Sequence, residues 1–162
     1  MAAIIGEESV MQAAQSAFIT STYWTDRIGP AASIACINKM KELNVPEHLI
    51  EVGDLVQKGW REASLKSKVD IKISGIAPLG HFGFNYDNAL LLKTLYTQEM
   101  LKRGFLASTA FYASYAHSKE LVKDYVKNIF EVFEIIANAI KNNSELELLE
   151  GSVCQSGFKR LT

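Results

Sequence analysis

Apolar residues recur at the three-to-four residue spacing of an amphipathic helix in four segments of the chain. This pattern predicts helices over residues 30–44, 46–66, 88–103 and 119–140. Pro30 suits the first turn of the first helix, where a missing amide hydrogen has no cost. The second helix is expected to bury Leu49, Ile50, Leu55, Val56 and Trp60. The last helix carries the widest apolar stripe, which needs a second layer to pack against. That stripe consists of Leu121, Val122, Tyr125, Val126, Ile129, Phe130, Phe133, Ile136 and Ile140.

Three residues are placed to begin or end these helices. Asp87 and Ser118 have side chains that can accept from the first free backbone amides, so both are expected to be N-caps. Gly104 can adopt the left-handed conformation that ends a helix.

Alternation of apolar and other residues predicts strands. The stretch "KVDIKISGIAPLGHFGFN" indicates two antiparallel strands joined around "GIAPLG", and "FLASTAFYASYA" indicates one or two more. Near the N-terminus, "AAIIG" is typical of a short buried strand closed by Gly6, with a short helix after it. Residues 144–162 lack periodicity and are expected to be extended and poorly tied down unless they dock on a partner. The fold class that follows is α+β, a small antiparallel or mixed sheet covered on one face by helices.

Composition and charge narrow the class of protein. With 162 residues and 48% hydrophobic residues, the chain can form one domain with a core, or a small domain plus a piece of something larger. The formal charge of -1 gives no electrostatic reason to expect nucleic acid or an anionic membrane as partner. No apolar run reaches the roughly 20 residues of a membrane span, and no export signal is evident, so the cytoplasm is the expected location.

The residues alone indicate no self-sufficient catalytic centre. His48, His81 and His117 are far apart and lack metal-ligand spacing, so a cap, surface or core role is expected for each, and no metal is expected. Cys36 and Cys154 lack a CxxC spacing and are expected to be plain thiols.

A hydroxyl-rich segment, "FITSTYWTDRIGP", stands directly before the helix that starts near Pro30. Such hydroxyls, together with the free amides of a helix start, suit an anion such as phosphate. The other interpretation is that Thr20, Ser21, Thr22 and Thr25 simply cap a turn. Arg27 could donate two hydrogen bonds to a substrate carboxylate or phosphate, or could pair with Asp26, which is the favoured interpretation.

Five blocks of sequence together resemble the C-terminal part of a class III aminotransferase, a pyridoxal-phosphate (PLP) enzyme of fold type I. The blocks are "AAIIGEESVMQAA", "FITSTYWTDRIGPAA", "LKRGFLAST", "YASYAHSKELV" and "GFKRLT", and they occur in family order over essentially the whole chain. The resemblance is closest to the branch that contains glutamate-1-semialdehyde aminomutase.

The resemblance implies roles for part of the hydroxyl-rich segment. In such enzymes a threonine before a proline-started helix reaches across a dimer interface to the partner subunit's cofactor phosphate. Thr22 is the choice for this role, with Ser21 and Thr25 as substitutes, and Arg27 is the candidate substrate contact. A homodimer is therefore expected.

The resemblance also implies an order of domains. Residues 1–30 would be a remnant of the large cofactor-binding domain, 31–66 connecting helices, 67–143 the C-terminal α+β small domain, and 144–162 an extended tail. The lysine that links PLP would lie just upstream of "AAIIG", so the chain is expected to be a fragment without catalytic residues.

The parent enzyme would transfer an amino group between an amino donor and a carbonyl acceptor, or move it within one molecule. Lys39, Lys41 and Lys68 are not expected to replace the missing lysine, so the chain alone is expected to be inactive. Two alternatives remain open: a non-catalytic dimerisation or binding module, and a half-enzyme whose catalytic portion is a separate polypeptide.

Overall fold

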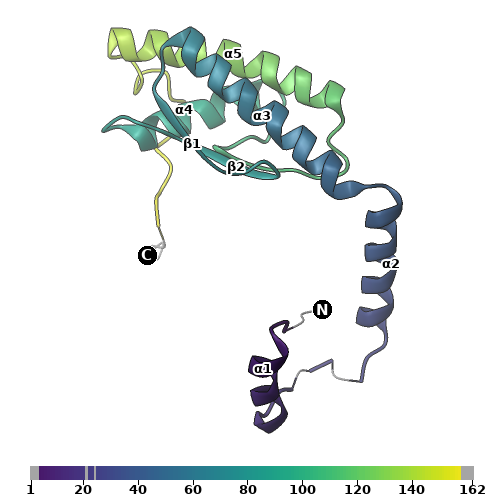
Figure 1. The fold of residues 1–162 in the computed structure, drawn as a ribbon. Helices are drawn as coiled ribbons and strands as arrows, with labels where there is room; N and C mark the ends of the chain where they lie inside the picture. The colour runs from purple at the N-terminus through teal and green to yellow at the C-terminus, as the bar shows by residue number, and fades with distance from the viewer. Residues whose placement is uncertain (1–3, 21, 24, 158–162) are drawn as a thin grey trace. The chain divides into compact units, whose positions relative to one another are not determined.

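The computed structural model describes residues 4–20, 22, 23 and 25–157 of the 162-residue chain. The chain divides into two units, Met1–Val45 and Pro46–Thr162. The first unit contains α1 (Glu8–Met11), the 3₁₀ helix η1 (Gln12–Ser16) and α2 (Ile28–Glu42). Along the rest of the chain follow α3 (Val45–Ser67), β1 (Ile71–Ile76), β2 (Leu79–Phe84), α4 (Ala89–Lys102), β3 (Ala110–Tyr112) and α5 (Lys119–Asn142) (Figure 1).

The first unit contributes no buried side chain from its helices. Pro30 lies in the first turn of α2, as predicted, although the helix already begins at Ile28. The predicted N-terminal strand is wrong for its described part, because Ile4 and Ile5 are not in a strand and are 68% and 91% exposed. Among the described residues, the sheet contains only β1 to β3, so this segment has no strand to pair with. Other large apolar residues of the unit are also exposed: Val10, Phe18, Ile19, Tyr23, Ile28, Ile34, Ile37 and Met40.

The second unit is built on an antiparallel sheet with strand order β1-β2-β3. The hairpin predicted around "GIAPLG" is confirmed, with Ile76 opposite Leu79 and a turn at 77–78. Along β2 the side chains alternate, so that Phe82 and Phe84 are buried while His81 is exposed. Of the predicted strands in 105–116, only Ala110–Tyr112 forms one.

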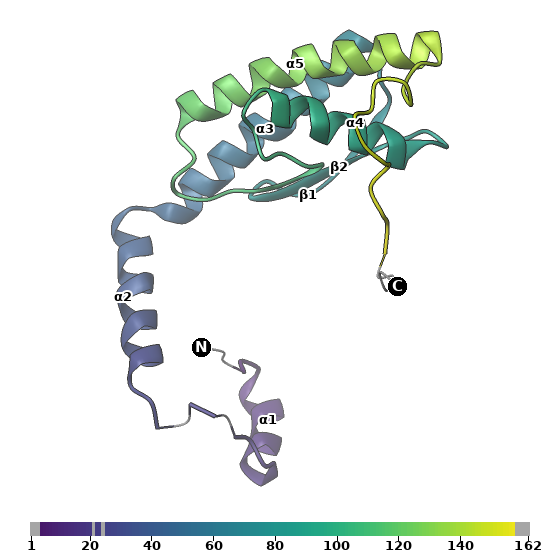
Figure 2. The same cartoon turned by 180° about the vertical axis from the view of Figure 1, so that it is seen from behind.

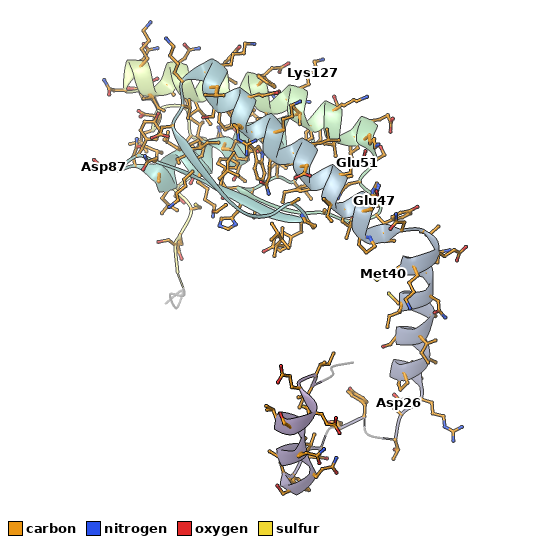
Figure 3. All side chains as sticks on the ribbon, viewed as in Figure 1. Asp26, Met40, Glu47, Glu51, Asp87 and Lys127 are labelled. Atoms are coloured by element: carbon orange, nitrogen blue, oxygen red, sulfur yellow. The ribbon has the colours of Figure 1, made fainter. Side chains whose placement is uncertain are left out.

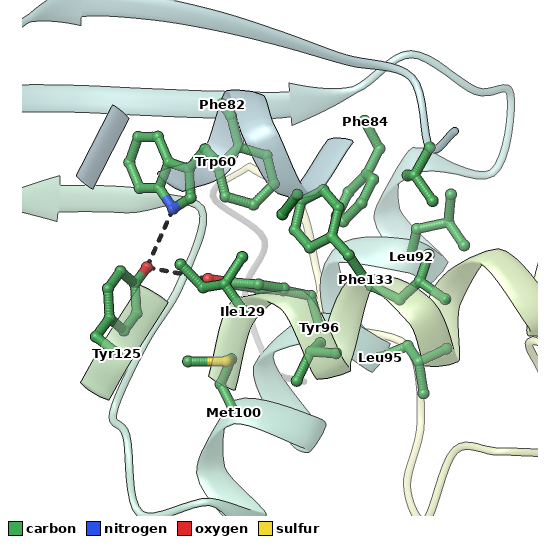
Figure 4. Close-up of a cluster of buried hydrophobic side chains, with 14 of the residues drawn as sticks. Trp60, Phe82, Phe84, Leu92, Leu95, Tyr96, Met100, Tyr125, Ile129 and Phe133 are labelled. Carbon is green, nitrogen blue, oxygen red and sulfur yellow. Dashed lines mark hydrogen bonds between the residues drawn. The ribbon is translucent and has the colours of Figure 1, made fainter. Parts of the chain in front are cut away.

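Helices α3, α4 and α5 lie on one face of this sheet, as the two opposite views agree (Figures 1 and 2). The α+β fold class with one helix-covered sheet face is confirmed. The core is an aromatic cluster around Phe82, whose ring centroid lies 5.0 Å from Trp60, 5.3 Å from Tyr96 and 5.9 Å from Phe133 (Figure 4). Edge-to-face contacts of this kind add to the free energy gained by burying the rings.

Two expected core residues are instead exposed. Ile50 is 49% exposed, because the buried face of α3 carries Val52 and Val56, and Ile50 lies two positions before that face. Leu121 is 46% exposed, while the next residue, Val122, is buried. Val56 and Trp60 are fully buried, as predicted.

Two of the three residues that were predicted to begin or end a helix do so. The Ser118 hydroxyl accepts from the backbone amide of Leu121 at 3.2 Å, and Gly104 has a φ of +84°. The Asp87 prediction is wrong, because Asn88 occupies the N-cap position of α4. The amide of Asn88 does not cap the helix but donates to Glu145 Oε1 at 3.1 Å.

The prediction of a loose tail is wrong for its described part, residues 144–157, here termed the C-terminal strap. The Gln98 side chain of α4 donates to the carbonyl of Leu148 at 2.9 Å and accepts from the amide of Glu150 at 2.8 Å. One turn earlier, Thr94 Oγ1 accepts from the amide of Cys154 at 3.0 Å. Two polar residues of α4, one helical turn apart, thus hydrogen-bond to backbone groups of the strap. The spacing of apolar residues in the sequence carries no signal of these hydrogen bonds.

Candidate functional site

The hydroxyl-rich segment forms a turn directly before α2. Thr22 and Thr25 are exposed in this turn, whereas Ser21 lies outside the described residues. Asp26, labelled in Figure 3, fixes the turn, because its amide donates to the Tyr23 carbonyl at 3.1 Å. Its Oδ1 accepts from the amide of Ile28 at 2.9 Å. The threonine hydroxyls are therefore presented to solvent beside the start of a helix.

Arg27 occupies the N-cap position of α2, and its side chain is exposed. The favoured pairing with Asp26 is wrong: no ion pair joins these two described residues, and the Asp26 carboxylate accepts from the backbone amide of Ile28. The guanidinium is left available to an anion. Its assignment as a substrate contact, like that of Thr22 and Ser21 as cofactor contacts, stays a prediction.

The described turn fits one edge of a phosphate and not a complete PLP site. The hydroxyls of Thr22 and Thr25 and the Gly29 amide near the helix start are suitable donors for an anion.

Every described lysine is exposed except Lys93, which is half-buried. Carboxylates of Glu150 and Glu99 raise the pKa of Lys102, which favours the protonated form over the neutral amine that attacks a carbonyl.

The three histidines have different surroundings in the second unit. His81 Nε2 lies 2.9 Å from Ser74 Oγ on the exposed sheet face. His117 Nδ1 accepts from the Ser114 amide at 2.9 Å, in the turn before α5. His48 packs its ring 5.0 Å from that of Tyr115, and its buried Nε2 has no hydrogen-bond partner among the described residues. The described residues include no group of three or more possible metal ligands.

A groove of about 440 Å³ lies between β3 and the first turns of α5, and sequence reasoning missed it. It is here termed the edge groove, and its lining is formed by residues 104–107 and 110–112, with His117, Leu121, Val122 and Tyr125. Three ring contacts join Phe105, Phe111, His117 and Tyr125, at centroid distances of 5.0 to 6.4 Å. The aromatic content of "GFLASTAFY" was the available signal, but only folding brings α5 beside it.

Below the groove, Tyr125 joins a buried hydrogen-bonded network (Figure 4). Its hydroxyl accepts from Trp60 Nε1 at 3.2 Å and lies 3.0 Å from the hydroxyl of Tyr96. Burial raises the pKa of both tyrosines, and for Tyr96 the neighbouring Tyr125 raises it further. Both phenols are therefore neutral at neutral pH. The hydrogen bonds to Trp60 and Tyr96 fix the orientation of the Tyr125 ring.

Comparison with known proteins finds similarity in structure. No family model matches the chain, and no curated protein matches it. A solved structure of a PLP-containing protein does match, so the fold is that of a segment of such a protein. The matched protein is FumI of Sphingopyxis sp. MTA144, in its PLP internal aldimine form. The TM-score is 0.74 at 20% sequence identity over 90% of this chain, which spans only 36% of the FumI chain.

None of the described helices has the length and apolar character needed to cross a membrane.

Proposed function

We propose that this chain forms the C-terminal part of a PLP-dependent aminotransferase or aminomutase of class III, similar to glutamate-1-semialdehyde aminomutase. The enzyme would transfer an amino group between an amino donor and a carbonyl acceptor. The observation that carries the proposal is the fold, which matches a segment of FumI with a TM-score of 0.74 over 90% of the chain. The sequence blocks that resemble the family are a second support, because they depend on residue identity and not on the fold.

In this proposal the turn before α2 holds one edge of the cofactor. Thr22, with Ser21 or Thr25 as substitutes, donates to the phosphate, and Arg27 contacts an anionic group of the substrate. The exposed hydroxyls of Thr22 and Thr25 and the exposed guanidinium of Arg27 support this assignment. When bound, PLP supplies an electron sink for the transfer of nitrogen, which these residues do not provide.

The lysine that links the cofactor is proposed to lie outside residues 1–162. Every described lysine except the half-buried Lys93 is exposed, which supports this, because a linking lysine needs a desolvated or otherwise activated amine. The chain alone is therefore proposed to be inactive, and to act together with a cofactor-binding large domain. A cytoplasmic location is part of the same proposal.

A homodimer is proposed, in which Thr22 reaches the phosphate bound by the partner subunit. Ten large apolar residues in the described part of the first unit are exposed, for example Phe18 at 93% and Ile28 at 76%. Apolar surface of this extent typically marks an interaction site.

The test is to express the gene with any in-frame sequence that precedes Met1, add PLP, reduce with borohydride and map the modified lysine by mass spectrometry. The expected result is one modified lysine N-terminal to Met1, and no modification of the 162-residue chain expressed alone. A specifically modified lysine within residues 1–162 would overturn the proposal, and so would the absence of modification in both proteins.

The same preparation tests the phosphate contact. Loss of one hydrogen bond to a charged group corresponds to about 1.5–3 kcal/mol, so Thr22→Ala should weaken PLP binding by at least about tenfold. Thr20→Ala is the matched control, since Thr20 is also exposed but lies outside the described turn. Equal effects of the two substitutions would contradict the role of Thr22.

A further inference from the structure

The chain between α4 and α5 contains an extended segment that is only partly used by the sheet. Along residues 105–113 half-buried and exposed side chains alternate strictly, which is the period of a β-strand. Only residues 110–112 pair with β2, and just before them the Thr109 carbonyl accepts from the Phe82 amide at 2.9 Å. Within the described chain, no hydrogen bond is made by the backbone groups of residues 106–108. These residues precede β3, and within the described chain their backbone groups are left open to pairing.

The sequence of this edge lacks the features that prevent pairing with another strand. Proteins protect exposed edges with charged side chains, proline or bulges. The stretch "GFLASTAFY", residues 104–112, contains neither a charge nor a proline. The opposite edge strand of the same sheet, β1, carries the exposed Lys72. The contrast indicates that the unprotected edge is covered in the working protein.

The edge groove beside this segment sets the chemistry of what can cover it. Its lining contains no aspartate, glutamate, lysine or arginine, and Phe105, Phe111 and Tyr125 give it aromatic walls. Leu106 borders the groove and is 97% exposed. A volume of about 440 Å³ accommodates large apolar side chains, and an ionised group placed there would lose hydration without gaining a counter-charge.

We propose that residues 106–108 pair with an extended, uncharged segment of the cofactor-binding large domain of the same enzyme, whose apolar side chains fill the edge groove. The proposal rests on the proposed function. This chain corresponds to 36% of the FumI chain, so most of such a protein lies outside the part that the chain matches. Strand addition at an open edge provides backbone hydrogen bonds, while the groove selects the side chains.

The experiment compares hydrogen exchange of the amides of residues 106–108 in two proteins. One is the 162-residue chain alone, and the other is the complete enzyme expressed with its upstream sequence. Exchange is expected to be fast in the chain alone. In the complete enzyme every second amide of this segment should exchange at least about tenfold more slowly, because successive amides of a strand point to opposite edges and paired amides open less often. Leu106→Lys should remove this protection in the complete enzyme. Leu65→Lys is the matched control, since Leu65 is 73% exposed on α3 and does not line the groove, and it should leave the protection unchanged.

The outcomes separate this proposal from the proposed function. If the modified lysine maps upstream of Met1 while these amides stay fast in the complete enzyme, the docking proposal fails and the proposed function stands. If no lysine is modified in either protein, the proposed function fails by itself. Slow exchange in the chain alone would show that the edge is covered by residues 1–162 or by a second copy, and would also overturn the proposal.

Discussion

The Tyr125 hydroxyl, at the centre of the buried hydrogen-bonded network, gives the sharpest test of the core. Tyr125 bonds two neighbours, Trp60 at 3.2 Å and Tyr96 at 3.0 Å, whereas Tyr96 bonds only Tyr125 within this network. Trp60 and Tyr96 are fully buried, so water does not replace a lost partner without rearrangement. Tyr125→Phe therefore leaves two buried polar groups without their partner, and Tyr96→Phe removes only one of the two bonds.

The magnitude follows from this difference. A buried donor left unsatisfied costs about 1–3 kcal/mol, and a lost hydrogen bond about 1 kcal/mol. Tyr125→Phe should then lower the free energy of unfolding by about 2–4 kcal/mol, and Tyr96→Phe by about 1 kcal/mol. The ring volume is nearly unchanged in both variants, so no large cavity contributes.

Urea denaturation followed by Trp60 fluorescence measures both values. The chain has two tryptophans, so a Trp24→Phe background isolates the signal of Trp60. The two variants should share the m-value of the parent and differ only in the transition midpoint. Equal destabilisation by Tyr125→Phe and Tyr96→Phe, or a loss below about 0.5 kcal/mol for Tyr125→Phe, would refute the reasoning.

Three further predictions concern packing, the strap and pH. Gly53→Ala should destabilise by about 1–3 kcal/mol in thermal melts, because the new methyl group would overlap the backbone carbonyl of Ala77; an unchanged melting temperature would contradict this close approach. Gln98→Ala should free the C-terminal strap, which limited proteolysis within residues 144–157 would detect as faster cleavage, and an unchanged cleavage rate would argue against the Gln98 bonds. Because burial raises the pKa of Tyr96, the unfolded state loses this proton first, so stability is complete below the ordinary tyrosine pKa of about 10 and falls as the pH rises above it. Tyr96→Phe should therefore make the alkaline decline shallower by up to about 1.4 kcal/mol per pH unit, measured by urea titration at several pH values; an equal slope would refute the assignment.

Local patterns predicted the helices well because their signals are short-range. Helical spacing of apolar residues, a serine before α5 and a glycine after α4 each act within one or two turns of the chain. Ser118 and Gly104 accordingly adopt the predicted roles. The prediction for Asp87 was wrong because aspartate and asparagine are both acceptable before a helix, and the side chain of Asn88, which takes the N-cap position, bonds to Glu145, a residue distant in sequence.

The types of residue in the sequence limit how far the functional site can be predicted. Hydroxyl and guanidinium groups before a helix suit anions, but Thr22 was selected among the hydroxyls only by the resemblance to the aminotransferase family, and the roles of Thr22 and Arg27 stay predictions. The hydrogen bond from the Ile28 amide to Asp26 could not be selected over an Asp26–Arg27 pair, because an aspartate side chain before a helix is able to make either contact.

The sequence by itself determined the helices, the hairpin and the α+β class, since each depends on periodicity and turn residues close together along the chain. Only the tertiary structure decided the strap on Gln98, the network of Trp60, Tyr96 and Tyr125, and the edge groove. The hydrogen bonds of the strap and the network join residues that are 29 to 65 positions apart. Such contacts depend on how side chains fill three-dimensional space, and local pattern carries no information about that packing.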